Sequence, residues 1–147
     1  MRSFSNTFAS VSTQQLIYRH TFRKAERLCS KKLITEVFEK GNSFYIKPFK
    51  TLWIDTTLST SVPAQLLITV PKRYMRDSWQ RNSIKRLIRE AYRLNKEPFY
   101  SILQQKQKQC ALAIVYTGRK IITAAEVESA IILILCRLTE EYEKITG

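Results

Sequence analysis

The sequence is short of the residues from which enzymes usually build a catalytic site. Its only histidine is His20, and its only aspartates, Asp55 and Asp77, have no carboxylate neighbour at a useful spacing. A His-based triad, a protein metal cluster and an autonomous metal-dependent nuclease are therefore disfavoured. The three glycines are too widely spaced for a glycine-rich phosphate loop. We assign the chain no catalytic residue and no metal ligand.

Cysteine pairs and long apolar runs are also missing. The three cysteines, Cys29, Cys110 and Cys136, are odd in number and lack CxxC spacing, which argues against a disulfide framework or a zinc site. We expect a reducing, cytoplasmic setting, with Cys110 and Cys136 packed in the core. The longest apolar run, residues 130–136, is too short to span a bilayer, so no membrane partner is expected.

Acidic residues are absent from residues 1–20, which are rich in Ser, Thr and Gln. Arginine is sparse there and no signal-peptide apolar core is present. This composition argues against an organelle transit peptide. It favours either a disordered leader that comprises residues 1–21 or a start codon assigned too far upstream. Residues 22–147 are long enough to form a single domain with a modest core.

Positive charge is the property that the sequence has in excess. It contains 25 Lys and Arg against 12 Asp and Glu, a net charge of +13. Residues 72–96 alone carry nine Lys or Arg against Asp77 and Glu90, which is +7. Such a concentration indicates an anionic partner, nucleic acid ahead of a membrane surface. Composition does not decide between DNA and RNA.

Hydrophobic periodicity and capping signals predict the order helix, three strands, helix, strand, helix. Ser30 is a suitable N-cap for the first helix, Gly41 ends it, and Thr123 with Glu126 forms a capping box for the last. The expected elements are a helix over 30–40, strands over 43–47, 49–56 and 64–70, a helix from about 81 that ends before Pro98, a strand over 110–117 and a helix over 123–144.

The central helix contains the segment QRNSIKRLIREAYR, residues 80–93. Cations recur every four residues at Arg81, Lys85, Arg89 and Arg93, and apolar residues occupy the opposite face. A charged helix face is often merely solvated, with acids interleaved as partners. This one has almost no acids, so its charges repel one another, and we favour a surface that binds a polyanion.

The start of this helix offers a further contact to phosphate. We expect the helix to begin at Arg81-Asn82-Ser83, so that its first backbone N–H groups add to the side-chain charge. Asn82 is then either the N-cap or a side chain that reaches a phosphate or a ribose hydroxyl.

Three segments of the sequence resemble one known family. RNSIKRLIREAYR (81–93) resembles the RNR signature of the bacterial ribonuclease P protein, RNRxKRxxRE, with Ser83 at the third position. FRKAERLCSKKLITEVFEKGNSF (22–44) is similar to the opening of that family. ITVPKR (68–73) is similar to the strand that ends in the family's Ser-Lys-Lys, with Pro71 in place of the usual serine. The resemblance covers residues 22–142.

The resemblance implies an α+β fold, a two-layer α/β sandwich of order α-β-β-β-α-β-α that is ribosomal-protein-like and has a left-handed β-α-β crossover, against the usual handedness. It implies a monomeric protein in a 1:1 complex with a catalytic RNA, and this ribonucleoprotein removes the 5′ leader of precursor tRNA. The chemistry and most of the magnesium are expected on the RNA.

The resemblance also assigns two RNA-binding surfaces. Contacts to the catalytic RNA are expected from Lys72, Arg73, Arg76, Arg81, Asn82, Lys85, Arg86, Arg89 and Arg93. Contacts to the single-stranded leader, in a cleft between the sheet and the first helix, are expected from Phe38, Tyr45, Lys47, Lys50 and Trp53. Aromatic rings can stack under leader bases, but core packing is the competing interpretation for the three aromatics, and simple solvation is that for the lysines. A ribosomal-type RNA- or DNA-binding protein without a processing role is the alternative function.

Overall fold

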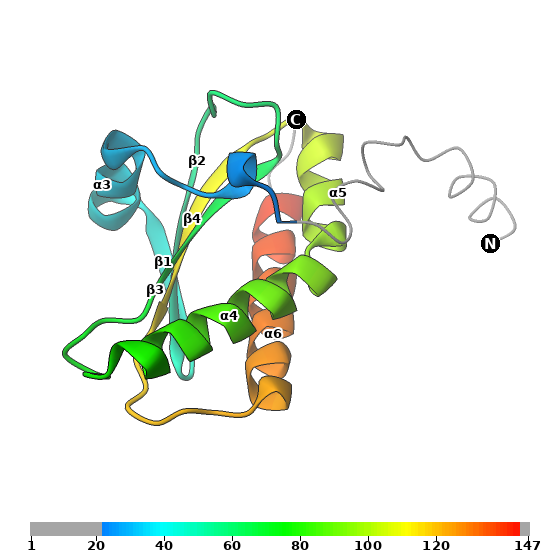
Figure 1. Ribbon diagram of the computed structural model, residues 1–147. Coiled ribbons are helices and arrows are strands. Elements are labelled where there is room, and N and C mark those ends of the chain that lie inside the picture. The colour runs from blue at the N-terminus through cyan, green and yellow to red at the C-terminus, as the bar shows by residue number, and fades with distance from the viewer. Residues whose placement is uncertain (1–21, 145–147) are drawn as a thin grey trace, which may run out of the picture.

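The computed structural model describes residues 22–144, which form one 3-10 turn, four α-helices and four strands (Figure 1). In chain order these are η1 (Lys24–Glu26), α3 (Lys31–Lys40), β1 (Asn42–Ile46), β2 (Phe49–Asp55), β3 (Ala64–Thr69), α4 (Ser78–Asn95), α5 (Glu97–Lys106), β4 (Cys110–Tyr116) and α6 (Ala124–Glu143). The predicted leader, residues 1–21, lies outside the described residues.

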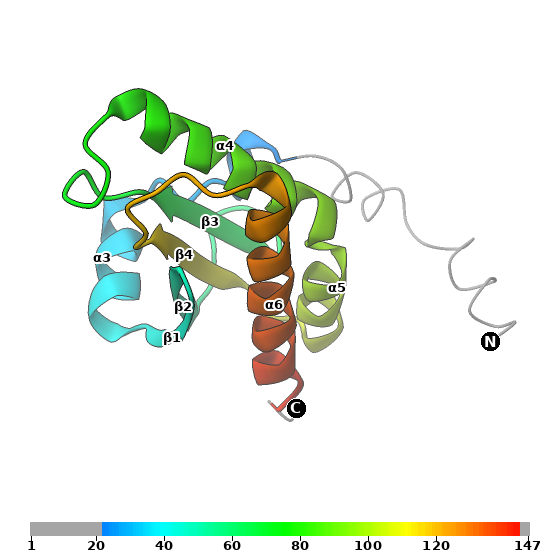
Figure 2. The ribbon, with the colours of Figure 1, turned by 90° about the horizontal axis from the view of Figure 1, so that it is seen from below.

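The four strands form one mixed sheet in the order β1-β2-β4-β3. β2 pairs antiparallel with both β1 and β4, and β3 runs parallel to β4. The connection from β3 to β4 passes over one face of the sheet through α4 and α5, and it is left-handed (Figures 1 and 2). The α+β class and the unusual crossover are thus confirmed.

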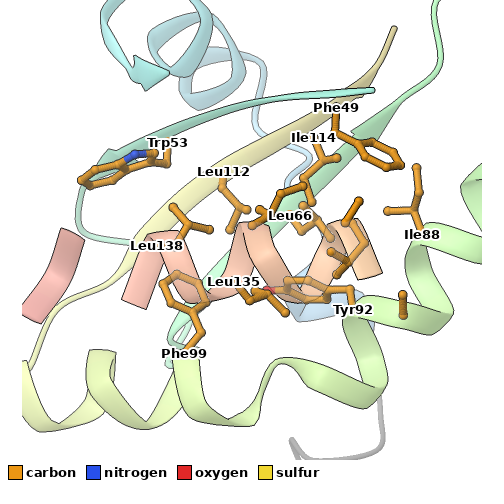
Figure 3. Packing of buried hydrophobic residues seen from close by; sticks show 14 of the residues in the cluster. Phe49, Trp53, Leu66, Ile88, Tyr92, Phe99, Leu112, Ile114, Leu135 and Leu138 are labelled. Carbon is orange, nitrogen blue, oxygen red and sulfur yellow. The ribbon is translucent and has the colours of Figure 1, made fainter. Parts of the chain in front are cut away.

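Alternation along the strands divides the side chains between two faces of the sheet. Phe49, Trp53 and Leu112 face α4, α5 and α6, where they join the larger hydrophobic core (Figure 3). On the other face, Leu52 packs in a smaller cluster with Val37 of α3. The sheet therefore has helices on both faces, where the sequence predicted two layers.

Helix α5 is missing from the sequence prediction. The basic helix does end before Pro98, as predicted, but a new helix begins at Glu97 directly after it. Pro98 lies in the first turn of α5, where an intrahelical partner for its backbone nitrogen is not needed. Gln107, in the left-handed conformation at φ 56°, ends α5 before β4 begins.

The caps predicted for α3 and α6 are confirmed. The Ser30 hydroxyl accepts a hydrogen bond from the Leu33 N–H at 3.3 Å, and Thr123 and Glu126 form the capping box of α6. Cys110 is buried as predicted, but the prediction for Cys136 is wrong, because α6 is amphipathic and turns this thiol to its exposed side. Among the described residues, no helix combines the length and the apolar character needed to cross a bilayer.

A buried ion pair attaches the N-terminal segment to the helical layer. Glu26 of η1 and Lys96, between α4 and α5, are both fully buried, and the ammonium of Lys96 donates to the Glu26 carboxylate. The same carboxylate accepts from the Tyr100 hydroxyl at 2.7 Å and from the Arg23 N–H at 2.9 Å. Lys96 therefore belongs to the core, and its charge is not part of the basic surface that residues 72–96 were expected to form.

Candidate nucleic-acid interface

Helix α4 presents an apolar stripe to the core and its cations to the other side. Ile84, Ile88 and Ala91 are buried at helical spacing, against the sheet and α6. The helix begins at Ser78, three residues before the predicted start, after Asp77 as the N-cap. Its first backbone N–H groups accordingly belong to residues 78–81 and not to 81–83.

This earlier start corrects the interpretation of Asn82. The residue lies inside the helix, so it is not the N-cap, and its side chain is exposed on the surface of α4. An exposed amide at this place remains available for a contact to phosphate or ribose, which stays a prediction.

Arg81 has a structural role in addition to its charge. Its guanidinium donates to the carbonyl oxygens of Met75 and Arg76, at 3.0 and 2.7 Å. These bonds hold the loop between β3 and α4, residues 70–77, against the first turn of α4, and we call this segment the basic loop. Because carbonyls are neutral acceptors, the positive charge of Arg81 is oriented by them and not cancelled.

The remaining cations of α4 fall into two groups by their partners. Arg86 is exposed, and Lys85 and Arg89 are half-buried on the side of α4 that faces β3. Arg93 instead forms an ion pair with Glu90, its Nε lying 3.3 Å from a carboxylate oxygen. The hydrogen bond from Arg93 lowers the pKa of Glu90 below its ordinary value, so the pair stays ionised and offsets one positive charge.

The loop between β3 and α4 extends the positive surface around the end of the sheet. Lys72, Arg73 and Arg76 are all exposed there. The Tyr74 ring contacts two guanidinium groups, that of Arg73 at 4.9 Å and that of Arg119 at 5.8 Å from its centroid. Such cation–π contacts hold the long side chains in place without neutralising them.

Three exposed residues of this region were not singled out from the sequence. Arg119 and Lys120 follow β4 and lie beside the basic loop through the Tyr74 contact. Trp79, in the first turn of α4, is 64% exposed. Two features of the sequence could have indicated these residues: the two adjacent cations after Gly118, and a tryptophan between polar residues next to the basic loop.

The second predicted surface lies on the far face of the sheet. Tyr45 and Lys50 are direct cross-strand neighbours of β1 and β2, and Lys50 is opposite Val115 of β4. Helix α3 covers the other half of this face (Figure 1), so Tyr45 is 57% exposed and Lys50 is exposed. The Tyr45 hydroxyl lies 3.2 Å from the Thr117 hydroxyl, which fixes the ring at the edge of the sheet.

Phe38 and Lys47 are the other two exposed residues that were predicted to contact the leader. Phe38, near the C-terminal end of α3, is 45% exposed and does not belong to either buried cluster of the described residues. Lys47, in the turn between β1 and β2, is exposed, and it lines a pocket with Ala125 and Ser129 of α6, on the helical side of the sheet. An exposed ring next to an exposed lysine, as at Tyr45 and Lys50, suits an unpaired strand, since bases stack on aromatic faces while phosphates contact the cations.

Trp53 does not belong to this surface. It lies on the opposite face of the sheet (Figure 3) and is only 7% exposed. Its ring centroid is 5.2 Å from that of Tyr142. The strand period explains the error, because Trp53 is three residues from Lys50 and so points to the other face. The core interpretation is the right one for Trp53.

The acidic side chains of the described residues do not gather into a metal-binding group. They contain no group of three or more His, Cys, Asp or Glu side chains that could hold a metal ion. Asp55 is engaged at 3.6 Å with Lys108, far along the chain from Asp77 at the start of α4. No catalytic step is therefore assigned to a metal held by these side chains.

The comparison with known proteins agrees with the sequence motif. The family model described as Ribonuclease P matches residues 22–129. The ribonuclease P protein component of Porphyromonas gingivalis is 31% identical over 115 residues, which cover 78% of this chain and 84% of that protein. The ribonuclease P protein component of Chlorobium phaeobacteroides is 29% identical over 110 residues, covering 69% of this chain and 75% of the relative.

Solved structures show the same fold at lower identity. The RNase P protein of Staphylococcus aureus superposes with a TM-score of 0.58 at 19% identity, covering 79% of this chain and 99% of that one. The RNase P protein of Thermotoga maritima gives a TM-score of 0.52 at 21% identity, covering 83% and 99%.

Proposed function

The chain belongs to the ribonuclease P protein family, and from this premise we propose how its two surfaces divide the work of tRNA processing. It is the protein component of a ribonucleoprotein endoribonuclease, and its partner is the ribonuclease P RNA. The proposal adds precursor tRNA as the substrate, one protein for each RNA, and the cytoplasm as the place of action.

Helix α4 and the loop that precedes it bind the catalytic RNA in this proposal. The supporting observation is the separation of the two sides of α4: one is buried in the core, and the other presents Arg81, Lys85, Arg86 and Arg89. Each cation that neutralises a phosphate releases counterions, which makes binding strong at low salt and weak at high salt. These charges repel one another in the folded, free protein, and bound RNA removes that repulsion.

The open half of the sheet binds the single-stranded 5′ leader. Phe38 and Tyr45 offer exposed rings for stacking, and Lys47 and Lys50 offer charge to the phosphates between the bases. Stacking tolerates any base because every base has an aromatic face. A surface of this kind holds leaders of different sequence, as a general processing enzyme requires.

Magnesium is assigned to phosphates of the RNA, and the protein contributes charge and orientation. Its cations screen the repulsion between the catalytic RNA and the precursor tRNA, which lowers the concentration of magnesium needed. Its leader surface fixes the strand on one side of the scissile bond, so that the bond is presented to the RNA active site in one orientation.

Reconstitution with the ribonuclease P RNA of the same genome tests the proposal. We expect cleavage of precursor tRNA at a magnesium concentration where the RNA alone is nearly inactive, and no cleavage by protein freed of RNA. Replacement of Arg86 by Ala should flatten the log–log salt dependence of RNA affinity by about one unit at most. Arg137→Ala, on the exposed side of α6, is the matched control and should leave that slope unchanged.

Two results would contradict the proposal. One is cleavage at low magnesium that is the same with and without the protein. The other is robust magnesium-dependent cleavage by RNA-free protein that persists after stringent removal of contaminating nucleases.

A further inference from the structure

A groove of about 400 Å³ runs between the N-terminal segment, the edge of the sheet and α4, and we call it the α4–β3 groove. Its lining includes Phe22, Arg27, Leu28, Ile68, Lys85 and Arg89. The groove lies on the same side of α4 as part of the basic surface. It is also lined by the N-terminal segment and by β3, neither of which belongs to the RNR signature. Its volume falls within the range of about 300–1,000 Å³ that is typical of ligand sites.

Three cations converge on this groove from two elements. Arg27 comes from the segment after η1, and Lys85 and Arg89 lie one turn apart on α4. Within residues 22–144, no acidic side chain forms an ion pair with any of the three, and none lines the groove. Like charges gathered at one place repel, so this arrangement favours an anion, above all a phosphate that several cations can share.

The rest of the lining is formed by apolar side chains and Cys29. Leu28 and Leu66 are nearly fully buried beneath it, and the Phe22 ring is held edge-on to Tyr92 at 5.8 Å, with the Arg27 guanidinium 5.9 Å from the Phe22 centroid. An aromatic ring beside a guanidinium provides a stacking surface for a planar base.

The groove also borders the backbone of an edge strand. β3 is the last strand of the sheet, and the N-terminal segment pairs with it through the isolated bridge between Arg27 and Leu66, where the Leu28 N–H donates to the Leu66 carbonyl at 3.0 Å. Past this bridge the strand continues along the groove at Leu67 and Ile68. Edge strands carry unpaired backbone N–H and C=O groups, which can bond to the polar edge of a base.

We propose that the α4–β3 groove holds one unpaired nucleotide of the ribonuclease P RNA. Its phosphate lies among Arg27, Lys85 and Arg89, and its base lies against Phe22 and the β3 edge. A paired nucleotide does not fit this role, because its base is stacked and its edge is occupied within the duplex. The inference rests on the proposed function, which supplies the RNA, and adds to it a defined position for a single nucleotide.

The cysteines of the chain provide a direct test. Cys29 is exposed and lines the groove, Cys136 is exposed on α6 beside Pro98 and Ile132, and Cys110 is buried. The full chain is treated with N-ethylmaleimide, with and without saturating ribonuclease P RNA, and each thiol is followed by mass spectrometry. We expect bound RNA to slow the modification of Cys29 at least tenfold and to leave Cys136 unchanged. Equal reactivity of Cys29 in the two samples, with RNA binding verified in the same tubes, would overturn the proposal.

A crosslink distinguishes an inserted nucleotide from a duplex that only covers the groove. In a Cys136→Ser variant, Cys29 is the one remaining exposed thiol of the three in the sequence, and it is derivatised with an azidophenacyl photocrosslinker. Primer extension on the irradiated complex should stop at a nucleotide that chemical probing shows to be unpaired in the bound RNA. A stop within a base-paired helix would contradict the insertion of a nucleotide.

A matched pair of variants separates this inference from the proposed function. Arg27→Ala should weaken RNA affinity about tenfold and restore the reactivity of Cys29, whereas Lys31→Ala, which removes the same charge from an exposed site outside the groove, should do neither. Normal affinity and normal stimulation of cleavage in Arg27→Ala would overturn the groove proposal and leave the function standing. Failure of the unaltered protein to bind the RNA would overturn both.

Discussion

Replacement of Lys96 by Met should destabilise the protein severely, although it removes a cation from a chain with a large excess of them. The Lys96 ammonium is fully buried and bonded to the Glu26 carboxylate, which also accepts from Tyr100 and from the Arg23 backbone. Methionine has nearly the same length and fills the same space, so the loss of packing is small. What remains is a carboxylate in the core without its cation.

The expected magnitude follows from that uncompensated charge. Removal of one partner from a buried ion pair costs about 3–5 kcal/mol, a large part of the about 5–15 kcal/mol that stabilises a typical domain. Two hydrogen bonds to the carboxylate persist and keep the value from rising further. Burial lowers the pKa of Lys96 below its ordinary value, yet the bond to Glu26 opposes that shift and retains the charge that the carboxylate needs.

A second variant identifies the cause. In Glu26→Gln/Lys96→Met the amide can accept from the Arg23 N–H and donate to the Tyr100 hydroxyl, and no charge is buried. We expect this double variant to be more stable than Lys96→Met alone, with the free energies of unfolding measured in urea and compared in a double-mutant cycle. A loss below about 1 kcal/mol in Lys96→Met, or strictly additive losses in the double variant, would refute the argument from a buried charge.

Two further predictions concern the leader surface and pH. Phe38→Ala should weaken the binding of precursor tRNA by about 1–3 kcal/mol relative to mature tRNA, whereas Trp53→Ala should lose about 3–5 kcal/mol of folding stability without that discrimination; equal weakening for both tRNAs in Phe38→Ala would exclude a leader contact. Burial raises the pKa of Tyr92 and raises that of Cys110 to about 12, so the folded protein keeps protons that the unfolded chain loses at high pH. Stability measured by urea titration should therefore fall as the pH rises above about 9–10, and a flat profile up to pH 11 would contradict this.

The sequence predicted the order of the main elements because its signals are local. Ser30, Gly41 and the Thr123–Glu126 capping box act within a few residues, and the helix ends lie where they indicate. Helix α5 was missed because Pro98 is ambiguous: the same residue disfavours the continuation of one helix and suits the first turn of another.

The side chains of the candidate site were predicted less well where their orientation depends on distant contacts. Trp53 and Lys50 lie on the same strand, and only the packing of α6 against one face decides which of the two is buried. Lys96 reads as a member of the basic run, and its burial depends on Glu26, which is 70 positions away. Arg119 becomes part of the basic surface only through its contact with Tyr74.

A chain of contacts joins the two proposed RNA surfaces around the end of the sheet. Arg81 binds the carbonyls at the end of the basic loop, and the Tyr74 ring of that loop contacts Arg73 and Arg119. The segment that carries Arg119 begins at Thr117, whose hydroxyl lies 3.2 Å from that of Tyr45. The cations in this series of contacts lie against aromatic rings or donate to backbone carbonyls, which hold them in position without neutralising their charge. A precursor leader on the sheet and a catalytic RNA on α4 would then meet at the basic loop, where their phosphates come closest and repel most. If the two surfaces bind these RNAs as proposed, the fold concentrates positive charge at the place where the approach of the two RNAs is least favourable, and charge held in a fixed position is what the protein contributes there.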